Sequence, residues 1–179
     1  MTTHTGVRRV RTRRNVAMSA GLLALALGVP VAASGQQAAA DPDPIAIEVL
    51  SRHAAFPDDV ALQVRRSLPG QETEVLNLKD AGHVVMARIV VQPGAAFPWH
   101  THPGPVIVSV AEGNLVYQQA SDCIERVYGT NQAFVDPGTQ IHTAWNPDEE
   151  PTVLTATFFG VPAGGAPTIP DPDQSDRCG

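Results

Sequence analysis

Two histidines stand one residue apart at the head of an apolar run. The segment from residue 99 to 115 reads WHTHPGPVIVSVAEGNL and contains His100 and His102. Side chains two positions apart on a β-strand point to the same face, so we expect both imidazoles on one face. The strand that continues into VIVSV is expected to bury that face. Buried imidazoles need polar partners, and one metal ion would satisfy both.

A third histidine, His142, follows a Pro-Gly turn in the segment DPGTQIHTAWN. Strands that are distant in sequence can be neighbours in an antiparallel barrel, so His142 can reach the other two. Three converging imidazoles form a half-open shell that suits Fe, Mn, Ni, Cu or Zn and leaves positions for water or substrate. The sequence therefore predicts a divalent transition-metal site at His100, His102 and His142. It leaves the identity of the metal open.

The elements that must position these histidines are predicted to be short strands. From residue 45 onwards, runs rich in Val, Ile, Phe and Thr alternate with turn-forming Pro, Gly and Asn residues. This punctuation is typical of an all-β sandwich or barrel, and no sustained helical period competes with it. We predict one barrel domain over 45–162. A polar linker at 34–44 precedes it, and a Pro- and Gly-rich tail at 163–179 is expected to lie extended on the surface.

The spacing of the histidines and glycines resembles that of the cupin superfamily, in its small single-domain, type-2 form. The first cupin motif matches at Gly94, His100, His102 and Gly113, and the second matches at Gly129, Pro137, His142 and Asn146. Two departures stand out. The family's glutamate falls on Val106 or Ile107, and the motif glycine after the proline falls one position early, on Gly138. The resemblance implies a jelly-roll (double-stranded β-helix) barrel with the three histidines as metal ligands.

Four residues around the histidines are weaker candidates for a ligand pocket: Trp99, Val106, Gln140 and Trp145. The two tryptophans flank the histidines, and Gln140 shares strand parity with His142. Val106 shares parity with His100 and His102, so it is expected to face the metal. A shell of three neutral ligands leaves more of the ion's charge exposed. We therefore expect a small-molecule ligand, with a preference for an anionic or chelating oxygen.

Three functions remain open at this stage, and no catalytic residue is assigned. One is an iron-dependent, dioxygenase-like enzyme, since three-histidine iron sites are known in thiol dioxygenases of this superfamily. Another is a metal-dependent isomerase, which needs a general base near the metal. Gln140 and Thr101 are the nearby polar residues, and neither is a good base. The third is a non-catalytic module that binds a small molecule, because one fold hosts many functions.

The first 33 residues have the pattern of an export signal peptide. An arginine-rich start ends at Arg14, an apolar stretch follows, and small residues predict cleavage near Ala33. Cleavage after Ala40 and a retained membrane anchor are the alternatives. The twin arginine at Arg13 and Arg14 loosely suits export of a folded protein, and the route stays open. We predict an exported protein, secreted or in the cell envelope, with no membrane segment after processing.

The cysteine count predicts a disulfide, and the net charge limits the classes of binding partner. Cys123 and Cys178 are the two cysteines of the chain, and in an oxidising exterior one disulfide is the expected outcome. The formal net charge is −6, and it becomes more negative once the arginine-rich signal is removed. An acidic domain is repelled by nucleic acid and anionic membranes, so neither is an expected partner. A homodimer is left open.

Overall fold

The computed structural model describes residues 41–69 and 71–179. The predicted signal peptide at 1–33 and most of the predicted linker at 34–44 lie outside the described residues. Within the described ranges, no helix has the length and apolar character needed to cross a membrane.

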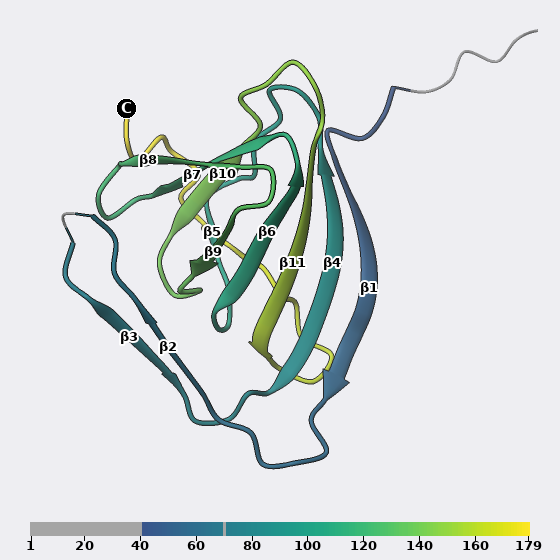
Figure 1. The fold of residues 1–179 in the computed structure, drawn as a ribbon, viewed down its shortest axis with the longest axis vertical. Helices are drawn as coiled ribbons and strands as arrows, with labels where there is room; N and C mark the ends of the chain where they lie inside the picture. Colours follow the sequence, from purple (N-terminus) through teal and green to yellow (C-terminus); the bar gives the residue numbers. More distant parts are fainter. Residues whose placement is uncertain (1–40, 70) are drawn as a thin grey trace, which may run out of the picture. The chain divides into compact units, whose positions relative to one another are not determined.

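The described chain is built from antiparallel strands (Figure 1). Their bounds are β1 Ile45–Ala55, β2 Leu62–Arg66, β3 Glu74–Leu78, β4 His83–Val91, β5 His100–Thr101, β6 Val106–Glu112, β7 Asn114–Gln119, β8 Glu125–Gly129, β9 Ala133–Asp136, β10 His142–Trp145, β11 Thr152–Val161 and β12 Ile169–Pro170.

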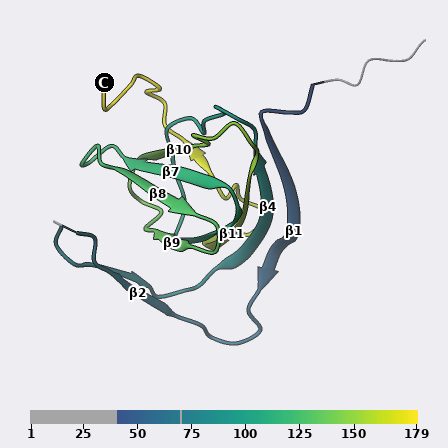
Figure 2. The same ribbon diagram turned by 45° about the horizontal axis from the view of Figure 1, so that its top comes forward.

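Two five-stranded sheets enclose the core. One has the order β1-β4-β11-β6-β9 and the other β12-β5-β10-β7-β8, while β2 and β3 form a separate hairpin. The long strands β4 and β11 form the centre of the first sheet, and the second sheet packs across them (Figures 1 and 2). This is the all-β jelly roll that the sequence predicts, and the prediction of fold class is confirmed.

Strand alternation explains which side chains fill the space between the sheets. In β4, Val85, Ala87, Ile89 and Val91 are buried, whereas Met86 between them is exposed. The β-branched residues on the inner face suit a pleated surface packed on one side. The core extends from β4 onto β11 and across to β7, where Tyr117 and Leu115 are buried. The same alternation carries the functional side chains inward.

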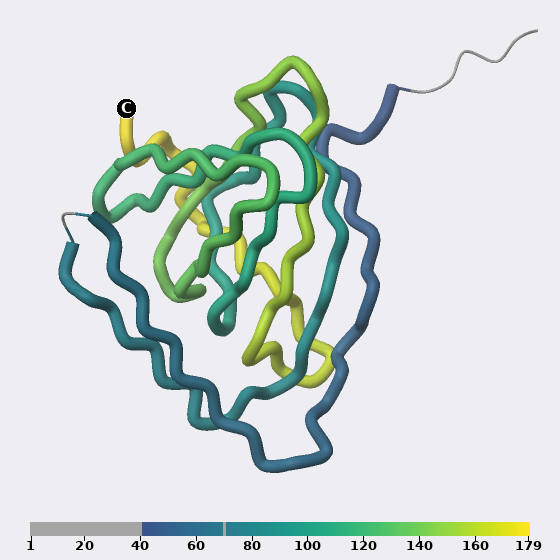
Figure 3. The backbone as a smooth tube through the Cα atoms, viewed as in Figure 1, coloured from purple at the N-terminus to yellow at the C-terminus, as the bar shows by residue number. Residues whose placement is uncertain are grey.

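The C-terminal tail also contributes a strand. Its strand β12 pairs with β5, with Ile169 opposite Thr101 and Pro170 opposite His100. In Figure 3 the yellow tube can be followed from the end of β11 across the barrel to the C-terminus. The two-residue strand β5 would otherwise leave an unpaired edge, which exposes backbone hydrogen-bonding groups. The tail is therefore exposed along most of its length and joins the second sheet through β12.

The expected disulfide joins Cys123, which follows β7, to Cys178 at the end of the tail. In the chain-entropy account, closing a loop of this size stabilises a fold by about 4 kcal/mol. The cross-link fixes the far end of the tail, while β12 fixes its start.

A turn between β9 and β10 requires glycine at Gly138. Its φ is +85°, and a Cβ there would lie 2.0 Å from the carbonyl oxygen of Gly104. The Gly138 carbonyl accepts a hydrogen bond of 2.7 Å from the backbone N–H of His102. This close backbone contact ties the segment after β5 to the turn before β10. The shift of the motif glycine to position 138 therefore has a steric reason.

We expect Gly138→Ala to destabilise the protein by at least about 2 kcal/mol, because it adds overpacking to backbone strain. Gly94 is the matched control, since it also has positive φ (+69°) but a Cβ there would meet nothing within 4 Å. Gly94→Ala should cost only the strain of about 1 kcal/mol. Urea unfolding of both variants measures the difference, and equal losses would contradict the role assigned to the Gly104 contact.

Candidate metal centre

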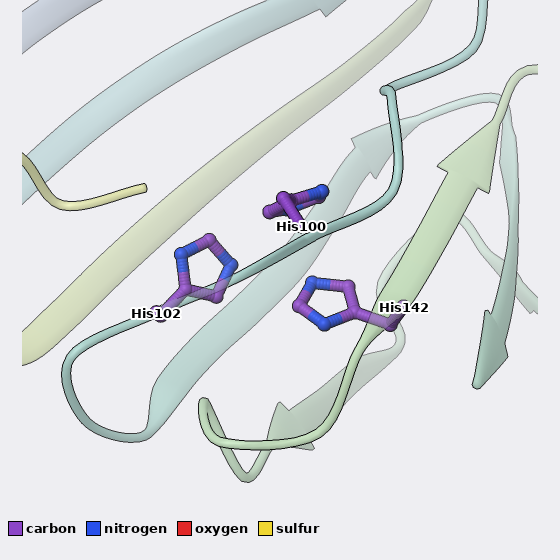
Figure 4. Close-up of side chains that lie close together, drawn as sticks. All are labelled: His100, His102 and His142. Carbon is purple, nitrogen blue, oxygen red and sulfur yellow. The ribbon is translucent and has the colours of Figure 1, made fainter. Parts of the chain in front are cut away.

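The structure brings together the three histidines that the sequence singles out. His100 opens β5, His102 follows it, and His142 opens β10, where it lies directly opposite His100 in the strand pairing. Ring centroids are 4.2 Å apart for His100 and His142, 4.8 Å for His100 and His102, and 5.0 Å for His102 and His142. All three side chains are buried. Figure 4 shows the rings gathered around one space.

Each imidazole is held in one orientation by a backbone carbonyl. The Nδ1 atoms of His100, His102 and His142 lie 2.7, 2.7 and 2.8 Å from the carbonyl oxygens of Pro98, Pro167 and Gln140, respectively. A carbonyl oxygen can only accept, so each Nδ1 carries the proton. Each Nε2 is then the nitrogen left for another partner, which is the arrangement that metal-binding histidines use.

The donor set fits a divalent transition metal. Each histidine offers a ring nitrogen, and these nitrogens lie within 4.8 Å of one another. Ligand nitrogens 2.0–2.1 Å from a common ion can be at most about 4.2 Å apart, so small side-chain adjustments bring all three into coordination. Imidazole nitrogen suits Zn, Cu, Fe and Ni.

Burial keeps His100 and His102 neutral. The pKa of His100 is lowered to about 3. Removal from water is the largest cause, and the neighbouring His142 and His102 add to it. Desolvation also lowers the pKa of His102, against the opposing influence of Asp136. Neutral imidazole is the form that binds a metal, so these two side chains stay ready to bind one at mildly acidic pH.

A buried carboxylate, Asp136, was missed in the sequence analysis. It ends β9, and its Oδ2 lies 2.8 Å from Nε2 of His142. Its Oδ1 accepts a hydrogen bond of 2.5 Å from the N–H of Gly138. Burial opposes its ionisation, but contact with the imidazole of His142 holds the pKa of Asp136 below its ordinary value. Its parity with buried Phe134, two residues earlier, was the available signal.

The histidines lie at one side of a cavity of about 320 Å³ inside the barrel. Its walls are mostly apolar and come from both sheets. Trp99 and Val106 line it, as predicted for a ligand pocket. Ile107 is 42% exposed, so Val106 is the residue of that pair that faces inward.

Two pocket predictions need correction. Among the described residues, neither Gln140 nor Trp145 is part of the cavity wall. Trp145 has opposite parity to His142 and Ala144 on β10, which both face the cavity, so its side chain lies on the other face. Gln140 acts through its backbone carbonyl, which orients His142.

The C-terminal tail forms a further wall. Pro167, Thr168 and Pro170 line the cavity, and Pro167 orients His102. Beyond β12, the N–H of Asp171 and the side-chain amide of Gln174 both donate to the carbonyl of Trp99. The tail thus contacts the residues on both sides of His100.

One known protein family matches part of this chain. The family described as Cupin domain matches residues 87–158. A search of curated proteins finds no match.

Three solved structures illustrate the likeness. The cupin domain of an XRE family transcriptional regulator from Enterobacter cloacae is 16% identical, with a TM-score of 0.44 over 68% of this chain and 100% of that one. A protein with a double-stranded β-helix domain from Klebsiella pneumoniae is 20% identical (TM-score 0.38, covering 49% and 67%). A cupin-like protein from Thermotoga maritima is 28% identical (TM-score 0.41, covering 44% and 58%). These likenesses concern the fold alone.

We expect the metal-free protein to lose stability as the pH falls from 6.5 toward 4. The unfolded chain binds a proton at His100 in this range but the folded chain does not, and the lowered pKa of His102 acts in the same direction. The free energy of unfolding therefore falls as the pH falls. Each histidine contributes a slope of up to about 1.4 kcal/mol per pH unit. Urea unfolding in chelator at several pH values measures the slope. His100→Asn should flatten it, and an unchanged slope would contradict the account.

We expect removal of the disulfide to weaken metal binding through the tail. Without Cys123–Cys178 the tail is held less firmly, and the Pro167 carbonyl orients His102 less well. Loss of such an outer partner typically costs 10- to 100-fold in affinity, so a loosened one should cost up to about tenfold. Titration of Co²⁺ into wild type and a Cys123→Ser/Cys178→Ser variant tests this. Equal affinities would show that β12 pairing alone positions His102.

Proposed function

The chain carries a cupin domain, and on that premise we propose that it is a metal-dependent protein that acts on a small organic molecule inside its barrel. His100, His102 and His142 would hold the ion. The observation that carries this proposal is the fixed orientation of the three imidazoles, each with Nδ1 bonded to a backbone carbonyl beside an apolar cavity. A structural role for these histidines would not need three ring nitrogens within 4.8 Å of one another.

The reaction that we favour is dioxygenase-like. When bound, a redox metal such as iron supplies Lewis acidity and the electron transfer that reaction with O₂ requires. Three neutral imidazoles leave coordination positions open for a substrate. The protein contributes an enclosed, mostly apolar space, which excludes water from reactive species.

The cavity favours a compact, mostly apolar ligand with one polar end. A volume of about 320 Å³ is at the lower end of the range for small-molecule pockets. Trp99, Phe97 and Phe158 offer aromatic surface for the ligand body. The polar end would lie near the histidines and the buried hydroxyl of Tyr117, for which the described residues supply no hydrogen-bond partner. The carboxylate of Asp136 offsets charge at the site, which weakens the earlier expectation of an anionic ligand.

A metal-dependent isomerase is the second candidate, and Asp136 is the observation that favours it. The sequence offered no good base near the metal site, whereas the structure contains a buried carboxylate beside His142. Non-catalytic binding of the same ligand is the third candidate. Metal identity separates the first candidate from the second, because an isomerase has no need of a redox metal.

We also propose that the protein works outside the cytoplasm, secreted or in the cell envelope. The Cys123–Cys178 disulfide supports this, since such cross-links persist in oxidising compartments. Nucleic acid and membrane partners remain disfavoured by the acidic charge.

The direct test is elemental analysis of protein purified from its native exported fraction. We expect close to one divalent transition metal per chain in wild type and almost none in His142→Ala. His83→Ala is the matched control, because His83 opens β4 and is not part of the cavity wall described above. It should retain the metal. Equal metal content in the two variants would overturn the assignment of His142, and zinc in place of iron would favour the isomerase.

A further inference from the structure

Asp136 lies beside the three histidines on the cavity wall. In the pairing of β6 with β9 its direct cross-strand partner is Val106, and both side chains line the cavity. Val106 faces the cavity, and valine cannot coordinate a metal. Directly opposite residues on paired strands have Cβ atoms about 4.5–5.5 Å apart. A carboxylate from position 136 therefore reaches the same part of the cavity as one from position 106.

The contact between Asp136 and His142 needs a cation. His142 Nδ1 donates its proton to the Gln140 carbonyl, so an Nε2 that carries no second proton is an acceptor. Oδ2 of the carboxylate is also an acceptor, and it lies 2.8 Å from that Nε2. Two acceptors at this distance repel unless a proton or a metal ion satisfies both. Both side chains are almost fully buried, so bulk water does not separate them.

The distance matches that of two neighbouring ligands on one ion. With metal–nitrogen and metal–oxygen bonds of 2.0–2.2 Å, ligands at a right angle lie about 2.9 Å apart. The carboxylate is also fixed, because Oδ1 accepts the hydrogen bond from the N–H of Gly138. That bond leaves Oδ2 directed to His142. A surface carboxylate would lack both this anchor and this burial.

We propose that Asp136 is a ligand of the metal and supplies, through Oδ2, the one anionic oxygen in a shell of three imidazoles. This inference rests on the proposed metal site and goes beyond it. The acidic ligand comes from β9, the strand next to the one that carries Val106. It also gives the Asp136–Pro137–Gly138 turn a second role, since the turn positions the carboxylate as well as the segment after His102.

The test compares wild type with Asp136→Asn. The asparagine side chain keeps an oxygen for the Gly138 N–H and brings an N–H that can donate to His142 Nε2. The metal-free variant should therefore fold and melt at or above the temperature of wild type. Its affinity for Co²⁺ should fall by more than the roughly 10- to 100-fold typical of a partner outside the coordination shell. Its Co²⁺ absorption spectrum should also change, because the spectrum reports the ligand set.

A double variant, the swapped variant, moves the carboxylate to the paired strand and tests for recovery of metal binding. Val106→Glu combined with Asp136→Asn returns a carboxylate from the opposite strand, and it should regain most of the lost affinity. Asp148→Asn is the matched control, since Asp148 also accepts internal hydrogen bonds but from Asn114, away from the histidines. It should bind Co²⁺ as wild type does.

The outcomes separate the two proposals. Failure of wild type to bind Co²⁺ would overturn the metal site itself. Binding by wild type and Asp136→Asn with affinities within threefold, or with the same spectrum, would leave the site intact and overturn the ligand role of Asp136. If Asp136→Asn does not fold, the swapped variant decides: no Co²⁺ binding by a folded swap would also overturn the proposal.

Discussion

The pairing of β5 with β10 is the constraint on which the site depends. It sets His142 directly opposite His100, and strand alternation then brings His102 to the same face. Strand β5 has only two residues, so its position depends on neighbours: β10 on one side and β12 on the other. The site is thus assembled from three segments that are distant in the sequence. None of them could hold the imidazoles in place alone.

Backbone groups, rather than side chains, maintain this arrangement. The three carbonyls that orient the imidazoles belong to Pro98, Pro167 and Gln140, and two of these are prolines. A proline has a fixed φ, which limits the movement of the backbone that carries the carbonyl. The Gly138 carbonyl adds a fourth backbone contact, to the N–H of His102. Side-chain substitutions on these segments therefore affect the site mainly through the path of the backbone.

Local pattern was sufficient to predict much of the site. Turn residues and β-branched runs indicated the all-β fold, and strand parity placed His100, His102 and Val106 on one inner face. Parity could also have excluded Trp145, which is one residue out of phase with Ala144 on β10. The error came from using closeness in sequence to His142 in place of strand direction.

What could not be predicted depends on pairing between distant strands. Asp136 begins the segment DPGTQIHTAWN that contains His142. Its role follows from the β6–β9 register that sets it opposite Val106, and no local pattern gives that register. The pairing of the tail with β5 also depends on distant strands. Its Pro and Gly content is typical of a surface segment, yet the open edge of β5 needed a partner and β12 supplies it.

The distribution of polarity in the barrel follows from these pairings. β4 and β11 contribute apolar side chains to the cavity. The histidines and Asp136 come from β5 and the residue after it, from β10 and from β9. Charge is therefore confined to one corner of an otherwise apolar space. In such surroundings electrostatic interactions are stronger than in water, so a ligand with one polar end has one favourable orientation. Specificity for that orientation comes from the separation of polar and apolar walls, which strand order alone establishes.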